Sequence, residues 1–134
     1  MRDLHNNIKA EIALNTTAIS SNATTAGAII DMQGYGAVEF IIQSGSLTDG
    51  TYTPLLQEGA ASNLSDATTV ATSDTLGTIA GATFALTDDN AAKKIGYIGN
   101  KRYVRLSLVS TSVTTGGTVS AVAVKGMAAD RPVG

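Results

Sequence analysis

The chain has 134 residues, a formal net charge of −2 and no cysteine. This length suits one domain, which buries roughly two thirds of the surface of its unfolded chain. The charge argues against general nucleic-acid binding, which requires several phosphates to be neutralised. The lack of cysteine excludes disulfides and thiolate metal sites. No segment approaches the ~20 apolar residues of a membrane helix, and residues 1–14 lack the apolar run of a signal peptide. We expect a soluble single domain with no membrane partner.

Residues 1–15 are expected to form an N-terminal arm that precedes a single domain over residues 16–134. The arm carries four apolar residues: Leu4, Ile8, Ile12 and Leu14. The first three are four residues apart, which fits one face of a helix but equally one face of a strand, so periodicity does not decide between them. Because none of the four has a clear partner in the strand pattern that follows, we expect them to bind a neighbouring protein.

The rest of the chain has the pattern of an all-β protein. Short apolar runs alternate with turn residues at intervals of about 8–12 residues, which is typical of antiparallel sandwiches and barrels. Strands are expected at residues 26–31, 37–45, 51–58, 82–87, 93–98, 102–110 and 118–126, with a long loop at residues 61–78. Hairpin turns are predicted at Asp49-Gly50, Gly99-Asn100 and Thr114–Thr118. Pro54 cannot donate to a strand ladder, so it predicts an edge or a bulge.

Two of these strands alternate clearly between apolar and polar positions. In residues 37–45 the inward side chains are expected to be Val38, Phe40 and Ile42. In residues 102–110 they are expected to be Val104, Leu106 and Leu108. Tyr103 and Arg105 would then point outward. Aromatic residues make up only 4% of the chain, so we expect a thin core built from Val, Ile and Leu.

The charges are distributed unevenly along the chain. Residues 10–92 contain nine acidic residues and no Lys or Arg, whereas residues 93–125 contain basic residues and no acids. One interpretation is that acidic and basic strands lie side by side and offset each other within the domain. The other is that two oppositely charged faces meet neighbouring subunits. In either case we expect Lys101, Arg102 and Arg105 to serve protein–protein electrostatics, with carboxylates such as Glu39 or Glu58 as partners.

Motifs that would carry chemistry are weak. Gly96-Tyr97-Ile98-Gly99 matches the bare pattern of a KH loop, but its flanks have strand spacing, so the glycines are expected to permit a bend or turn. Tyr97 and Tyr103 beside basic residues could stack nucleobases, which the acidic remainder argues against. His5 is the only histidine, and Asp88-Asp89-Asn90 is an ordinary turn former. We expect no enzymatic activity, no metal, no cofactor and no nucleic-acid partner.

Six stretches together resemble a family of small structural proteins of tailed bacteriophages: "MRDLHNNIK", "GYGAVEFII", "SLTDGTYTPLLQEG", "TLGT", "IGYIGNKRYVRLSL" and "AVAVKGMAADRP". The resemblance runs nearly end to end. It implies a capsid decoration, or cement, protein: a small, jelly-roll-like β-sandwich bound outside an HK97-type shell. The implied partners are the major capsid protein and neighbouring copies of the chain. The implied location is the capsid surface, after synthesis in the cytoplasm of the bacterial host.

Two other functions fit the same sequence. A head–tail or tail-tube component of the virion would form a ring instead of coating a lattice. A carbohydrate-binding module would normally expose Trp or Tyr platforms, but this chain has no Trp and four Tyr residues.

Overall fold

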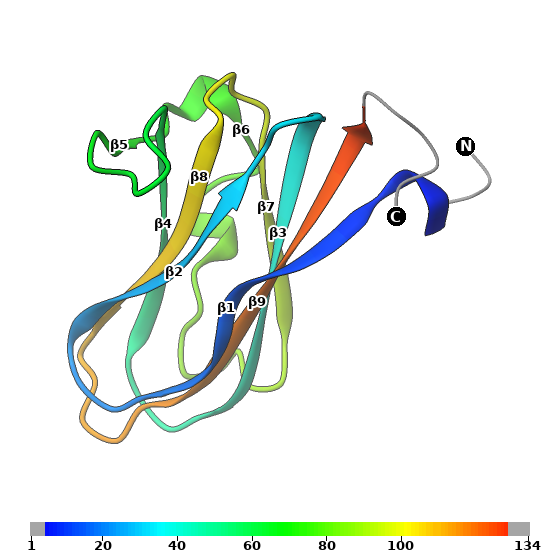
Figure 1. Ribbon diagram of the computed structural model, residues 1–134. Helices are drawn as coiled ribbons and strands as arrows, with labels where there is room; N and C mark the ends of the chain where they lie inside the picture. The colour runs from blue at the N-terminus through cyan, green and yellow to red at the C-terminus, as the bar shows by residue number, and fades with distance from the viewer. Residues whose placement is uncertain (1–4, 129–134) are drawn as a thin grey trace.

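The computed structural model describes residues 5–128 and shows two antiparallel sheets packed face to face (Figure 1). The strands are β1 (Lys9–Ile19), β2 (Ala23–Asp31), β3 (Tyr35–Leu47), β4 (Thr51–Gly59), β5 (Thr68–Thr69), β6 (Thr75–Leu76), β7 (Ala92–Tyr97), β8 (Tyr103–Thr111) and β9 (Gly117–Ala128). Three short 3-10 turns complete the described elements: η1 (His5–Asn7), η2 (Thr72–Asp74) and η3 (Ala80–Ala82).

The strand order is that of a jelly roll. One sheet has the order β1-β9-β3-β7-β6 and the other β2-β8-β4-β5. Early strands therefore pair with late ones in reverse order: β1 with β9, β2 with β8, β3 with β7 and β4 with β5. This pairing is that of a long hairpin rolled into two sheets, and it confirms the predicted antiparallel β-sandwich.

The turns predicted as hairpins are instead corners between the two sheets. Asp49-Gly50 joins β3 to β4, Gly99-Asn100 joins β7 to β8, and the turn before Gly117 joins β8 to β9. In each case the two strands belong to different sheets. The hairpin prediction was wrong because turn residues report a reversal of the chain and not which strand becomes the partner.

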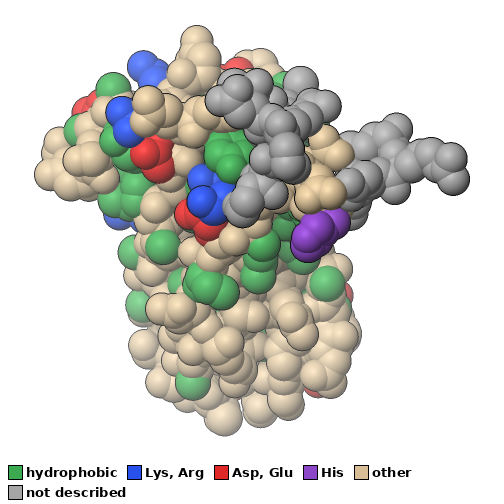
Figure 2. Space-filling model, turned by 45° about the vertical axis from the view of Figure 1, so that its right-hand side comes forward, with side chains coloured by type: hydrophobic (Ala, Val, Ile, Leu, Met, Phe, Trp, Pro, Cys, Tyr) green, Lys and Arg blue, Asp and Glu red, His purple; other side chains and the backbone are tan. Residues whose placement is uncertain are grey.

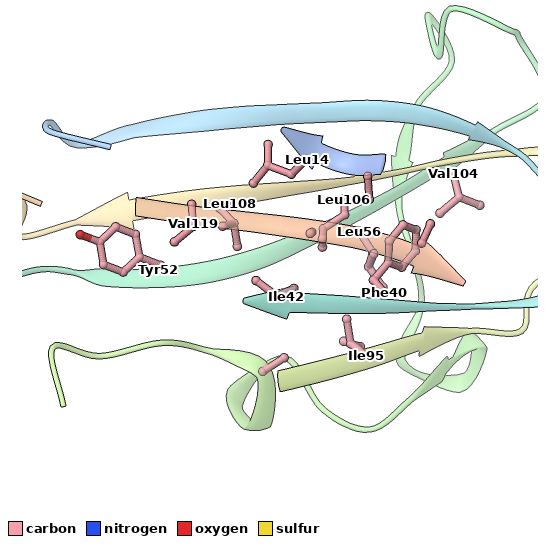
Figure 3. Close-up of a cluster of buried hydrophobic side chains, with 14 of the residues drawn as sticks. Leu14, Phe40, Ile42, Tyr52, Leu56, Ile95, Val104, Leu106, Leu108 and Val119 are labelled. Carbon is pink, nitrogen blue, oxygen red and sulfur yellow. The ribbon is translucent and has the colours of Figure 1, made fainter. Parts of the chain in front are cut away.

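The core forms where the two alternating strands face each other, as Figure 3 shows for its central residues. All six side chains predicted to point inward are buried, with at most 2% of their surface exposed: Val38, Phe40, Ile42, Val104, Leu106 and Leu108. Burying each contributes ~1.5–3 kcal/mol before ordering costs. The expectation of a core built from Val, Ile and Leu was incomplete, because three aromatic residues are fully buried in addition to Phe40: Tyr52, Phe84 and Tyr97.

The expected arm boundary at residue 15 is also wrong. β1 begins at Lys9 and pairs with β9 through the expected arm, for example Glu11 with Ala123 and Leu14 with Ala121. Leu14 is buried, with 4% of its surface exposed. β1 was not predicted because its second half is rich in Thr and because its ladder partner, β9, lies far away in the sequence.

Two other regions depart from expectation. Residues 82–87 form no regular strand, although Phe84 makes an isolated bridge to Tyr52 and is buried. The long loop at residues 61–78 contains β5, η2 and β6. Phe84 forms backbone hydrogen bonds with β4 at Tyr52, and Val70 forms one at Leu56. Pro54 lies between these two positions, where no neighbouring strand requires an N–H donor, as predicted for an edge.

Candidate interaction surfaces

Two predicted interface residues lie on the outer side of the four-stranded sheet, where each is held by a neighbour. Arg102 donates two hydrogen bonds to Asp31, from Nε to Oδ1 and from Nη2 to Oδ2, both at 3.0 Å. Arg105 donates from Nη2 to Oε1 of Gln57 at 2.7 Å. The Arg102 guanidinium also lies 5.0 Å from the ring centre of Tyr103. We call these five residues the arginine surface.

The arginine surface has its own electrostatics. The hydrogen bonds from Arg102 hold the pKa of the Asp31 carboxyl below its usual value, and the same bonds raise the pKa of Arg102. Both side chains are nearly half exposed, so solvent screens the pair and it adds little to folding stability. Its main effect is to fix the plane of the Arg102 guanidinium group.

The partners of the basic residues differ from those expected. Glu58 accepts a hydrogen bond from the Tyr97 hydroxyl at 2.6 Å, and Glu39 lies on the other sheet. Among the residues described, further cations are paired within the domain: Lys93 with Asp88 at 3.3 Å and Lys125 with Glu11. These pairs support the interpretation that acidic and basic strands offset each other. Lys101 is exposed.

The glycine and tyrosine pattern has a packing explanation. Tyr97 is 1% exposed, so its ring cannot serve as a platform for a base. Burial, then the hydrogen bond to Glu58, raises the pKa of Tyr97 far above its usual value. Gly96 lies in β7 and not in a turn, which corrects the expectation for this residue. A Cβ on Gly96 would lie 2.8 Å from Oε1 of Glu39, and one on Gly99 would lie 2.5 Å from the Tyr97 hydroxyl oxygen.

The expected N-terminal interface residues separate from one another and from the arginines. Ile12 points outward from the five-stranded sheet and is 56% exposed. Ile8, just before β1, is partly exposed. Leu14 is buried and cannot contact another protein in the folded domain, which corrects that prediction. Leu4 lies outside the described residues. Because Ile12 and Arg105 project from opposite faces of the sandwich, they cannot belong to one contact patch.

The outer side of the five-stranded sheet carries an apolar row. Ile12 on β1, Val122 on β9 and Ile41 on β3 are consecutive partners across the ladder. Ile41 is 39% exposed, and its side chain, like that of Ile12, points away from the core. We call this row, with its neighbours Ala10 and Val124, the apolar face.

Sequence reasoning missed a buried lysine. Lys125 is only 4% exposed; it is paired with Glu11, donates to the carbonyl oxygen of Asp31 at 3.0 Å, and lies 4.6 Å from the centre of the Tyr35 ring. A signal was available, because Lys125 continues the every-second-residue pattern of Val119, Ala121 and Ala123, all buried.

The charged side chains are unevenly distributed over the face that Figure 2 shows. Figure 2 shows charged side chains gathered in the upper part of the view, whereas the lower part is nearly free of them. At the end where β3 turns into β4, Asp49 accepts hydrogen bonds from the Thr114 hydroxyl and from the backbone of Thr115 and Gly116. These bonds lower the pKa of Asp49 to about 2.

Neither a metal cluster nor a membrane-spanning helix is found in the described part of the chain. No group of three or more His, Asp or Glu side chains between residues 5 and 128 could hold a metal ion. His5 is exposed in η1. None of the helical segments described is long and apolar enough to cross a membrane.

A hollow of about 440 Å³ opens beside β4, next to Pro54. It is lined by apolar side chains and by threonines: Pro54, Leu55, Leu56, Thr69, Val70, Thr72, Thr75, Gly77, Thr78 and Ile79. It lies where β5 is too short to cover the length of β4.

No protein-family model matches the chain, and no curated protein matches it in sequence. Among solved structures, its fold is similar to that of the SPBc2 prophage-derived protein YomS. The identity is 13% and the TM-score 0.50, over 89% of this chain and 92% of that one. A second match, in the structure of the infectious bursal disease virus Gx strain, has 14% identity and a TM-score of 0.46, over 93% of this chain and 33% of that one. At these identities the likeness is one of fold.

Proposed function

We propose that this protein is a structural component of a tailed-phage virion, which binds the outside of the capsid and stabilises the shell. The role is one of binding and not of catalysis. The observation that carries it is the arginine surface, where an aromatic ring and two oriented guanidinium groups stand together on an open sheet face. Tyr and Arg are enriched in protein interfaces and among their strongest contacts.

The phage context has two sources of support. The sequence resembles phage structural proteins, and the fold resembles that of a prophage-derived protein over nearly the whole of both chains. Jelly rolls also recur in viral capsid domains, which is an analogy of fold and not of site. Together they favour the major capsid protein as the partner, and repeated copies over a lattice make modest contacts sufficient.

The test is a binding titration against capsids that lack this protein. Arg105→Glu keeps the Asp31–Arg102 pair intact, and the double variant Arg102→Glu with Arg105→Glu reverses both charges. Lys9→Glu, an exposed change at the start of β1, is the matched control. We expect co-sedimentation with capsids to weaken at least tenfold in the double variant, less in Arg105→Glu, and not in the control.

A parallel filter assay with DNA and RNA addresses the competing function. Decoration that is unchanged in both arginine variants, combined with a nucleic-acid affinity that they lose, would replace the capsid role with a nucleic-acid role. Circular dichroism of each variant checks that the sandwich remains folded.

A further inference from the structure

Two opposite charges lie beside each other on the outer side of the five-stranded sheet without direct contact. Glu39 on β3 is opposite Gly96, and Ile41 is opposite Lys94, so Glu39 and Lys94 are diagonal neighbours across the ladder. Within residues 5–128 neither side chain takes part in a hydrogen bond or ion pair. Burial raises the pKa of Glu39, which Lys94 partly opposes.

Apolar side chains lie on both sides of this charged pair. On one side is the apolar face, with Val122 and Ile41. On the other side is Leu76 of β6, which is opposite Gly96 and 53% exposed. The side chains of Glu39 and Leu76 cover Gly96, because a Cβ there would lie 2.8 Å from Oε1 of Glu39 and 3.2 Å from Cβ of Leu76.

The pattern is complementary to itself. Consider a two-fold axis in the plane of the face that bisects the line from Glu39 to Lys94. It places each carboxylate opposite the ammonium group of another copy, as an isologous contact requires. On the ladder the same axis passes close to Ile41, Val122 and Leu76, so that each of these meets its own counterpart. The strands of the two copies then cross steeply, as in orthogonally packed sheets.

We propose that this face is the contact between two copies of the chain, with Glu39 of each copy paired to Lys94 of the other. Five strands at a spacing of ~4.8 Å and the length of β9 from Thr118 to Gly126 at ~3.3 Å per residue give a face of roughly 600 Å². That is somewhat below the ~800 Å² that each partner contributes to a standard interface. The dimer is therefore concentration-dependent. Dimerisation does not depend on the proposed capsid binding, because the arginine surface lies on the four-stranded sheet.

The test uses two charge-reversal variants, each of which should dimerise poorly by itself and well when mixed with the other. In Glu39→Lys and in Lys94→Glu, like charges face each other twice in every homodimer, so we expect self-association at least tenfold weaker than in the wild type. In an equimolar mixture of the two variants, both pairs of the mixed dimer are attractive. The introduced lysine of one copy faces the introduced glutamate of the other, and the unchanged Lys94 faces the unchanged Glu39. Sedimentation velocity of the mixture should recover the wild-type dimer.

Control variants separate charge from apolar contact. Ile41→Asp should abolish dimers of every combination, while Lys9→Glu should leave dimerisation unchanged. A wild-type protein that stays monomeric at all concentrations overturns the proposal, and so does a mixture that gains no dimer. Capsid co-sedimentation of Lys94→Glu distinguishes the two proposals, because a monomer that still binds capsids leaves the proposed function intact.

Discussion

The buried pair of Lys125 and Glu11 allows a quantitative test of what stabilises the open end of the sandwich. Lys125 is almost fully buried, whereas the Glu11 side chain is 32% exposed. Removing one partner of a buried pair costs ~3–5 kcal/mol, because the other charge is left without compensation. The two single changes should therefore be unequal.

Glu11→Gln leaves the buried ammonium group in place, so we expect it to lower the free energy of unfolding by ~3 kcal/mol or more. Lys125→Met leaves a carboxylate that water can reach and keeps most of the apolar volume, so we expect ~1–3 kcal/mol, largely from the lost charged hydrogen bond to the Asp31 carbonyl. The double variant should cost clearly less than the sum, because no unpaired charge remains.

Urea unfolding followed by far-UV circular dichroism measures all four proteins, with the exposed Lys9→Met as the control for removing a lysine from the same strand pair. Unchanged slopes of unfolding free energy against urea would show that the compared states are the same. A Glu11→Gln cost below ~1 kcal/mol, typical of an exposed pair, would refute the reasoning. So would strictly additive costs.

Two further predictions concern positions where the backbone is tightly placed. Gly27→Ala should cost ~3 kcal/mol or more or prevent folding, because its Cβ would lie 2.2 Å from the carbonyl oxygen of Leu106 and 2.3 Å from that of Ala13; thermal unfolding that matches the wild type would contradict this. Asp49→Asn should reduce the fall in the free energy of unfolding that the wild type shows as the pH is lowered from about 4 to about 2. The pKa of Asp49 is depressed in the folded state, so its contribution is complete above the unfolded value near 4 and is lost as the pH falls toward about 2. Unfolding experiments at pH 2–6 check this, and equal pH dependence in the wild type and the variant would count against it.

The parts of the fold that the sequence predicted are those with an unambiguous two-residue period. In β3 and β8 large apolar side chains alternate with polar ones, and both strands lie in the middle of their sheets, so local pattern and tertiary environment agree. β1 was missed because only Ala13 and Leu14 are buried near its centre, and register shifts on either side of Leu14 break the alternation.

The interaction surfaces were less predictable because they depend on which sheet a strand joins. Arg105 was placed outward correctly from its own strand, but its partner Gln57 comes from β4, and that of Arg102 from the end of β2. No rule of spacing gives those neighbours. Lys125 shows the reverse case. Its position fits the two-residue period of buried side chains in β9, but a lysine is normally expected at the surface.

The position of β9 has a consequence for how the protein is made. This strand lies between β1 and β3 in the five-stranded sheet, yet it is synthesised after all the other described strands. Until β9 is made, β1 has no ladder partner and one side of β3 is unpaired. Long-range pairing of this kind makes folding slow and leaves edges exposed to other chains meanwhile. A chain that stops before Gly117 has no strand to link β1 to β3, so the complete five-stranded sheet forms only after β9 has been synthesised.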